Sequence, residues 1–361
     1  MRYFSLLLCL MVAAGSMEAC NPGDTAVKKL PRTIQQQVDS IQKAEGLQGL
    51  FVAVMKNGKK DYYGAGFAIP DSKTRFDSAT LFEIGSISKT FTGYVLESVL
   101  RESGMSDSLS ILPFLPDSVQ KNKALQSITF YSLLNHSSGL PRLPDNMDLI
   151  SNPTAPYDNY TAKNLFAYLK TCTPQPTGGS SYSNLGAGLA GVLAQRISGK
   201  SYEDLLQKYI FNPFKIPQHR DATIKSNLNK AQGYFSDTES PYWFADILAP
   251  AGGLKCSADE LLSYLQHIIT PINTLSAQII EKLLTPTIRI SENVSVCRVW
   301  HTLETKGKPR IYWHNGGTYG FSSFAGFIEK ENKAVVVVIN QFNKNRISDA
   351  LGFTLLKQLM D

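Results

Sequence analysis

The pattern of apolar and polar positions predicts an amphipathic helix near each end of the chain. In residues 30–45 apolar side chains recur every three or four positions among Gln and Lys, and residues 346–360 repeat the pattern with a stripe of leucines. This spacing is typical of helices that bury one face. The stripes are Ile34, Val38 and Ile41 in the first helix and Leu351, Leu355, Leu356 and Leu359 in the second.

Strand patterns lie just inside these two helices. Residues 50–55 and 62–68 flank Asn57-Gly58, the strongest short signal for a β-hairpin. The remaining strand segments are residues 310–313, 322–328 and 334–339. In the last of these, four consecutive valines indicate a strand that is buried on both faces.

The middle of the chain, about residues 102–244, is rich in Pro, Asn and Ser and shows short helical patterns with little strand alternation. We expect an inserted, mostly helical lobe there. The sequence therefore predicts an α/β protein of the α+β type. An antiparallel sheet made from both chain ends is flanked by helices, and a site is expected in a cleft between sheet and lobe.

The first residues have the features of an export signal. Arg2 precedes residues 3–14, an apolar run without acid or base that is too short to span a bilayer. Cleavage after Ala19 would expose Cys20, so a lipid-modified Cys20 and a plain cleaved signal both remain open. The predicted segments are a signal peptide at 1–19, a linker at 20–30 and a folded domain at 31–361. We expect the mature protein in the periplasm or cell envelope, with membrane anchoring if Cys20 carries lipid.

Composition argues against several classes of protein. The net charge of +6 comes from scattered Lys and Arg without a basic block, which argues against a nucleic-acid partner. The cysteines of the mature domain, Cys172, Cys256 and Cys297, are odd in number and lack disulfide spacing. The five histidines never stand at i and i+4 around a glutamate, so we expect no metal and no cofactor.

Three serines are followed three residues later by a lysine, so this spacing alone is a weak signal. Ser40 and Ser118 are expected on the surface, one on the first helix and one in a loop. Ser86 instead begins a helix with apolar residues at every fourth position, which puts its backbone N–H at the positive helix end, where it can stabilise an oxyanion. Lys89, one turn later, can accept the hydroxyl proton if burial lowers its pKa. The alternative is that Ser86 only caps a core helix.

Two further triplets favour catalysis. Tyr182-Ser183-Asn184 follows a Gly-rich loop and precedes a helix that is expected to end at Ser198-Gly199, and His314-Asn315-Gly316 lies in the late strand region. Tyr157-Asp158-Asn159 and Lys56-Asn57-Gly58 have similar residue types, but we set both aside by position, since the second is the hairpin turn.

With Ser86-Ile87-Ser88-Lys89 as the first motif, these triplets follow in the order found in the penicillin-recognising serine hydrolases. The chain resembles the group that holds class C β-lactamases, DD-peptidases and related esterases. Residues 128–141, 251–254 and 314–321 match as well, so the likeness spans about residues 51–359. It implies a β-lactamase/transpeptidase-like fold.

The resemblance also implies roles for the motif residues. Ser86 would form the acyl-enzyme, while Lys89 and Tyr182 relay its proton and later activate water. The substrate-binding residues would be Asn184, which holds the substrate amide, His314, Gly316 and Gly317, whose N–H forms an oxyanion hole with that of Ser86. His136 resembles a structural histidine of the family and is left out of the site.

His314 departs from the lysine that many β-lactamases carry at this position. A histidine is mostly neutral above a pKa of about 6.5, so a substrate carboxylate would be held less firmly at neutral pH. This argues against efficient β-lactam hydrolysis. We predict that acylation by carboxylate-bearing substrates strengthens as the pH falls toward the imidazole pKa.

The leading hypothesis is an envelope serine hydrolase that acts on a D-alanyl peptide, a β-lactam or a small ester or amide. Its partner would be a small-molecule or peptidoglycan-peptide substrate. The alternative from another class is a penicillin-binding or sensing protein that is acylated without turnover, because the sequence does not place the deacylating water.

Overall fold

The computed structural model describes residues 33–176, 178–217 and 229–360. The predicted signal peptide, Cys20 and the linker lie outside these residues, so export and lipidation stay predictions. Along the described chain, no helix combines the length and the apolar character that crossing a bilayer requires.

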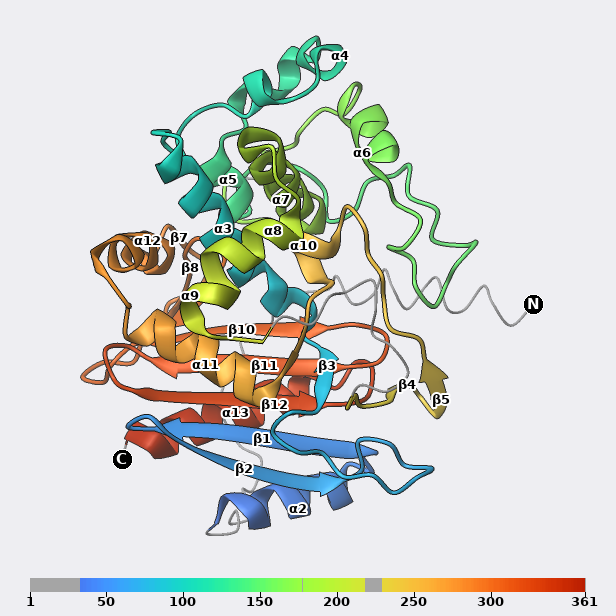
Figure 1. Ribbon diagram of the computed structural model, residues 1–361, viewed down its shortest axis with the longest axis vertical. Helices are drawn as coiled ribbons and strands as arrows, with labels where there is room; N and C mark the ends of the chain where they lie inside the picture. The colour runs from blue at the N-terminus through green and yellow to red at the C-terminus, as the bar shows by residue number, and fades with distance from the viewer. Residues whose placement is uncertain (1–32, 177, 218–228, 361) are drawn as a thin grey trace. The chain divides into compact units, whose positions relative to one another are not determined.

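Within the described residues, an antiparallel sheet of eight strands forms the centre of the fold, in the order β2-β1-β12-β11-β10-β9-β8-β7 (Figure 1). The strands are β1 (Gly49–Lys56), β2 (Lys59–Gly66), β7 (Ile288–Arg289), β8 (Val294–Val296), β9 (His301–Leu303), β10 (Ile311–Gly317), β11 (Ser322–Ile328) and β12 (Lys333–Ile339). Because β1 pairs with β12, the two ends of the chain meet in one sheet. The predicted fold class, an antiparallel sheet flanked by helices, is confirmed.

The first hairpin turns where the sequence predicted it. Lys56 pairs with Lys59, so the connection between β1 and β2 is the two-residue loop Asn57-Gly58. Both loop residues have positive φ angles, 54° and 80°. Asn and Gly are the residues that tolerate this conformation, and the tight turn fixes the register of the pair.

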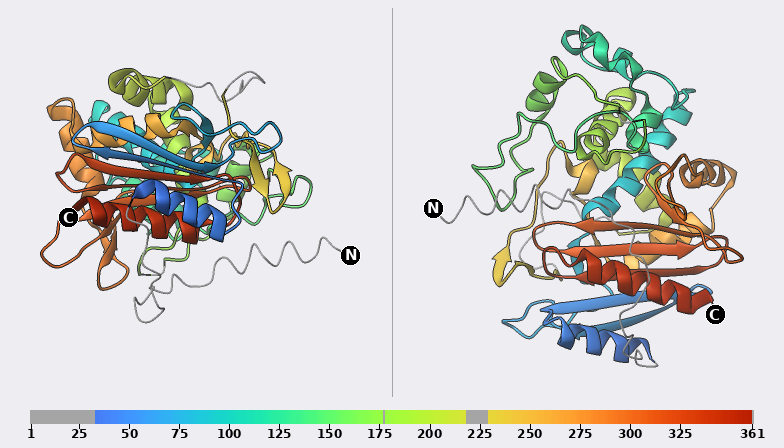
Figure 2. Two further views of the ribbon diagram at one scale, coloured as in Figure 1. Left: turned by 90° about the horizontal axis from the view of Figure 1, so that it is seen from below. Right: turned by 180° about the vertical axis from the view of Figure 1, so that it is seen from behind.

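Strand β12 separates two hydrophobic cores. Val335 and Val337 pack into one core with α2 (Ile34–Ala44) and α13 (Asn345–Met360). Val336 and Val338 pack into a second, larger core on the opposite face. Figure 2 shows α2 and α13 lying side by side against the same face of the sheet. Alternate side chains of a strand point to opposite faces, so the prediction of burial on both faces is confirmed.

Most other helices lie on the opposite side of the sheet, in the upper part of Figure 1. They are α3 (Ser88–Glu102), α4 (Asp117–Gln120), α5 (Phe130–Leu134), α6 (Ala162–Leu169), α7 (Asn184–Ser198), α8 (Tyr202–Leu206), α9 (Asn212–Phe214), α10 (Ala249–Gly252), α11 (Ala258–Ile269) and α12 (Thr274–Leu284). Short 3₁₀ turns are η1 (Gly85–Ile87), η2 (Leu112–Phe114) and η3 (Lys123–Ser127), and η4 (Gln207–Phe211) is a π-helical turn.

Two small strand pairs were not predicted. The segment predicted as mostly helical, about residues 102–244, contains the pair β4 (Gly233–Phe235) and β5 (Thr238–Ser240). The other pair joins β3 (Leu81–Glu83) to β6 (Lys255–Ser257). Strand β3 ends just before Ser86, so this pair fixes the approach to the candidate nucleophile.

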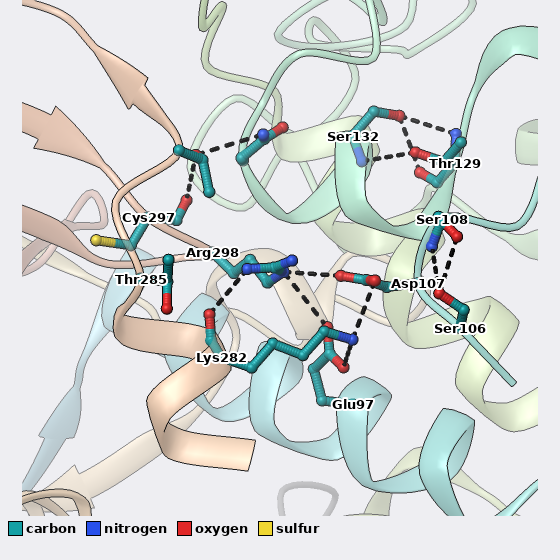
Figure 3. Close-up of polar contacts among 12 residues, drawn as sticks. Glu97, Ser106, Asp107, Ser108, Thr129, Ser132, Lys282, Thr285, Cys297 and Arg298 are labelled. Atoms are coloured by element: carbon teal, nitrogen blue, oxygen red, sulfur yellow. Dashed lines mark hydrogen bonds and ion pairs between the residues drawn. The ribbon is translucent and has the colours of Figure 1, made fainter. Parts of the chain in front are cut away.

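A cluster of four charged side chains joins α3 to α12 (Figure 3). Lys282 Nζ lies 2.7 Å from Glu97 Oε2 and 3.0 Å from Asp107 Oδ1, and Arg298 Nε lies 2.7 Å from Asp107 Oδ2. Burial raises the pKa of Glu97 to about 7. Burial also acts on Asp107, but hydrogen bonds from Lys282 and Arg298 outweigh it and lower the Asp107 pKa. Each acid in this charge cluster has a cation beside it.

Candidate active site

Ser86 lies in the 3₁₀ turn η1, which leads directly into α3, so it is at the loop-to-helix junction that the sequence predicted. The apolar residues at every fourth position, Ile87, Phe91, Val95 and Val99, are all buried. Ser86 itself is partly exposed. The buried helix therefore holds a solvent-accessible hydroxyl in a fixed place.

Glycines allow the backbone around Ser86 to touch β10. Gly85 has a φ of +52°, and a Cβ atom on it would lie 2.6 Å from the Gly317 amide nitrogen. A Cβ atom on Gly316 would overlap the Ile84 carbonyl oxygen. Only glycine fits at such approaches. The Ser86 and Gly317 amides thus belong to chain segments in direct contact, as a two-amide oxyanion site requires.

Lys89 is fully buried and forms three hydrogen bonds with uncharged groups. Its Nζ atom lies 3.0 Å from Ser86 Oγ, 2.8 Å from Asn184 Oδ1 and 2.5 Å from the Ala251 carbonyl oxygen. Burial lowers the pKa of Lys89 well below its ordinary value, and the nearby charge of Arg142 lowers it further. A neutral amine next to a hydroxyl can act as a general base.

Tyr182 lies beside the same pair. The centroid of its ring is 4.8 Å from Lys89 Nζ, and its phenol is within hydrogen-bonding reach of Ser86. Burial raises the pKa of Tyr182, so the phenol keeps its proton at neutral pH. His136 packs its ring against that of Tyr182 with centroids 4.5 Å apart, and its carbonyl accepts the Ser181 N–H at 2.7 Å. These contacts hold the tyrosine in place.

Asn184 begins α7 and connects Lys89 to a residue that the sequence analysis had set aside. While its Oδ1 accepts from Lys89, its Nδ2 donates to the Tyr157 hydroxyl at 2.9 Å. Tyr157 is buried, and burial raises its pKa to about 12. Tyr157 was set aside as the tyrosine of the second motif, and the fold brings it next to the site in another role, as the hydrogen-bond partner of Asn184. No local sequence signal marks it, since its contact with Asn184 spans 27 residues.

His314 is buried, with 1% of its surface exposed. Its Nδ1 lies 2.6 Å from the Asn315 carbonyl oxygen, and because a carbonyl can only accept, Nδ1 donates. Burial lowers the pKa of His314 well below 6.5, and His301 and Lys89 contribute in the same direction. His314 is then neutral around pH 6.5, and its Nε2 is a hydrogen-bond acceptor. Burial moves this protonation to lower pH, so the predicted gain in carboxylate binding is expected below the usual imidazole pKa.

Hydrogen bonds connect β10, the strand that carries His314-Asn315-Gly316, to helix α13. Asn315 Nδ2 donates to Asp349 Oδ2 at 2.7 Å, and Asn345 Nδ2 donates to the Gly316 carbonyl at 2.7 Å. Burial raises the pKa of Asp349 to about 7. Neither α13 residue was predicted to support the site, because the leucine stripe of this helix signals only its buried face.

The other serines and the cysteines considered in the sequence analysis are not part of the group around Ser86. Ser40 and Ser118 are exposed, as predicted, but Ser118 lies in the short helix α4 and not in a loop. Cys172, Cys256 and Cys297 are buried free thiols. In the described parts of the chain, no three His, Cys, Asp or Glu side chains gather in a way that could hold a metal ion.

Comparison with known proteins gives one family. The Beta-lactamase family model matches residues 31–357. A beta-lactamase from Providencia stuartii is 26% identical over 349 residues, covering 85% of this chain and 87% of that protein. Protein flp from Staphylococcus aureus strain MRSA252 is 25% identical over 86% of this chain and 64% of its own length.

Solved structures share the fold. The crystal structure of a beta-lactamase/D-alanine carboxypeptidase from Pseudomonas syringae superposes with a TM-score of 0.75 at 21% identity, covering 88% of this chain and 96% of that one. A class C beta lactamase from Rhodobacter sphaeroides gives a TM-score of 0.74, also at 21% identity, with 88% and 97% covered.

Proposed function

The chain belongs to the beta-lactamase family, and from this premise we propose that it is an exported serine hydrolase that forms an acyl-enzyme on Ser86. The observation that carries the proposal is the 3.0 Å contact between Ser86 Oγ and the buried Lys89 amine. A serine hydroxyl is a weak nucleophile until a base removes its proton, and this amine is suited to do so. The export part rests on the N-terminal sequence pattern.

In the proposed reaction, Ser86 Oγ attacks the substrate carbonyl while Lys89 takes the hydroxyl proton. The amides of Ser86 and Gly317 bind the oxyanion of the tetrahedral intermediate. The intermediate collapses when the bond to the leaving group breaks, and the leaving group takes a proton from Tyr182, which Lys89 replaces. Water then attacks the ester in the same way, the bond to Oγ breaks, and the acid is released.

The proposed substrates are D-alanyl peptides, β-lactams and small esters or amides. Among these, the neutral His314 favours small esters and amides without a carboxylate over efficient β-lactam turnover, because it offers a hydrogen-bond acceptor where a lysine would offer a charge. The similarity in fold to a beta-lactamase/D-alanine carboxypeptidase supports this range of acyl donors.

Intact-protein mass spectrometry over time tests the proposal. The protein is mixed with a fluorescent penicillin, a D-Ala-D-Ala peptide or a p-nitrophenyl ester. We expect one acyl group on Ser86 that later disappears, and no acyl group on Ser86→Ala. Ser118→Ala is the matched control, since Ser118 has the same spacing to a lysine but is exposed.

Three outcomes separate the alternatives. A permanent adduct would favour the sensing or penicillin-binding protein that is acylated without turnover. Equal labelling of wild type and Ser86→Ala would refute Ser86 as nucleophile. No labelling by any of these substrates would refute the hydrolase.

A further inference from the structure

Arg142 is an exposed residue whose backbone is fixed to the helix that carries Asn184. Its carbonyl oxygen accepts hydrogen bonds from the Asn184 N–H at 3.0 Å and the Leu185 N–H at 3.3 Å. The preceding carbonyl, that of Pro141, accepts from the Ser183 hydroxyl at 2.6 Å. Hydrogen bonds therefore join two segments that are about 40 residues apart in the sequence.

The guanidinium of Arg142 lies over the candidate active site. Its central carbon is 5.2 Å from the centroid of the Tyr182 ring, and that ring is also 4.8 Å from Lys89 Nζ. The positive charge reaches the site, because it contributes to the lowered pKa values of Lys89 and His136. In the described parts of the chain, no acidic side chain forms an ion pair with it and no hydrogen bond occupies its N–H groups.

Other basic groups near Ser86 do not offer a stable positive charge at neutral pH. Lys89 has a pKa well below its ordinary value because it is buried, and His314 is neutral for the same reason. An arginine side chain stays charged throughout the physiological range. Its five N–H groups form a planar fork that matches the two oxygens of a carboxylate.

The position of Arg142 also indicates which part of a substrate it would meet. Arg142 and Asn184 lie on two hydrogen-bonded segments on the helical side of Ser86, whereas His314 and Gly317 come from β10 on the sheet side. The family resemblance implies that Asn184 holds the substrate amide, which we take to lie in the acyl portion. A group a few atoms from that amide is therefore the part of the substrate that faces Arg142.

We propose that Arg142 is a specificity-determining residue that binds a carboxylate on the acyl portion of the substrate. The proposal rests on the proposed function, since it assumes that Ser86 takes up the acyl group. The substrate class is then an acyl donor with an acidic side group on the acyl side of the bond that breaks. A carboxylate on the leaving group gains nothing from this contact.

Three p-nitrophenyl-type esters test the proposal. One carries a glutaryl group, the second is its neutral methyl ester, and the third has a neutral acyl group and a carboxylate on the aromatic leaving group. The quantity measured is the ratio of kcat/KM for each charged ester to kcat/KM for the neutral ester. Wild type, Arg142→Gln and Arg142→Lys are compared, with Lys163→Gln as a control that removes one exposed charge from α6.

We expect Arg142→Gln to lower the glutaryl ratio about tenfold, which is the typical effect of losing one charge-assisted hydrogen-bonding partner. Arg142→Lys keeps the charge without the fork and should fall between Gln and wild type. Lys163→Gln should leave the ratio unchanged. Because Arg142 is exposed, raising the salt concentration should reduce the wild-type ratio.

An unchanged glutaryl ratio in Arg142→Gln overturns the proposal, and so does a loss confined to the ester with the charged leaving group. If wild type turns over none of the three esters and Ser86 takes up no acyl group, the proposed function itself fails. In the two results that overturn the proposal, Ser86 still reacts and only the role of Arg142 in substrate selection fails. The failure of the proposed function can therefore be distinguished from the failure of this proposal.

Discussion

Helix α3 carries a buried lysine, Lys89, and a buried glutamate, Glu97, about 12 Å apart along its axis. Lys89 contacts a hydroxyl, an amide oxygen and a carbonyl oxygen, all of them uncharged. Glu97 belongs to the charge cluster and contacts Lys282 at 2.7 Å and Arg298 at 3.7 Å. One helix thus presents a buried base without a counter-charge and a buried acid with two cations.

The difference separates a site for chemistry from a structural contact. A buried amine without an acidic neighbour loses its proton readily, and a neutral amine can act as a base. Charged side chains of opposite sign that face one another join the elements that carry them, here α3, α12 and the chain near β9. The following variants test whether the two regions are as different as their contacts indicate.

Lys89→Met has the largest expected effect. Removing the base should lower the acylation rate by on the order of 10³-fold. The free energy of unfolding should change by no more than about 2 kcal/mol, because the cost of burying the amine disappears while two acceptors lose their donor. Stopped-flow acylation and urea unfolding measure the two effects. Acylation within tenfold of wild type would show that another group takes the Ser86 proton.

Arg298→Met should give the opposite pattern. Its removal leaves Asp107 and Glu97 with one cation, and an uncompensated buried charge costs about 3 kcal/mol of unfolding free energy. The acylation rate of the folded protein should match wild type, since Arg298 makes no contact with the Ser86 group. Unfolding curves that coincide with wild type would mean that the charge cluster contributes little to stability.

Glu97→Gln should have a smaller, pH-dependent effect. The Glu97 pKa is raised to about 7 from 4.5, so between these values the folded chain holds a proton that the unfolded chain releases. The preference of folded Glu97 for its proton adds to the free energy of unfolding below pH 4.5, and this addition is lost as the pH rises through 7. Gln cannot ionise, so the stability of the variant lacks this pH dependence. The free energy of unfolding of Glu97→Gln, relative to wild type, should therefore rise between pH 5 and pH 8 by on the order of 1 kcal/mol.

Melting temperatures at the two pH values measure this gain, with Glu102→Gln as control. Glu102 is exposed and its pKa is lowered by hydrogen bonds from Lys208 and Tyr209. A constant difference between Glu97→Gln and wild type at both pH values would contradict the raised Glu97 pKa.

Elements with a long or strong local pattern could be predicted from the sequence. The Asn57-Gly58 turn requires positive φ angles that few residues adopt, and the four valines of β12 could only be buried. The helix after Tyr182 ends at Ser198, as predicted, and Gly199 follows it in the left-handed conformation. Strands β7, β8 and β9 were missed because two or three residues are too few to show a two-residue period.

The contacts of the candidate site also divide into those that the sequence could predict and those that it could not. Ser86 and Lys89 are three residues apart across the junction of η1 and α3, so their contact follows from local helical geometry. The contacts of Tyr157 with Asn184 and of Lys282 with Glu97 join residues 27 and 185 positions apart. Such contacts depend on how the chain folds back, and no spacing rule predicts them.

The most direct test is an NMR titration of the Lys89 side chain. Lysine labelled with ¹³C and ¹⁵N gives one set of side-chain signals for each lysine, and the signals of Lys89 are those absent from Lys89→Met. Because this amine is buried without an acidic neighbour, we expect its titration midpoint well below 10.5, so that it is neutral where the enzyme acts. A midpoint near 10.5 would mean that Lys89 stays charged and cannot take the Ser86 proton.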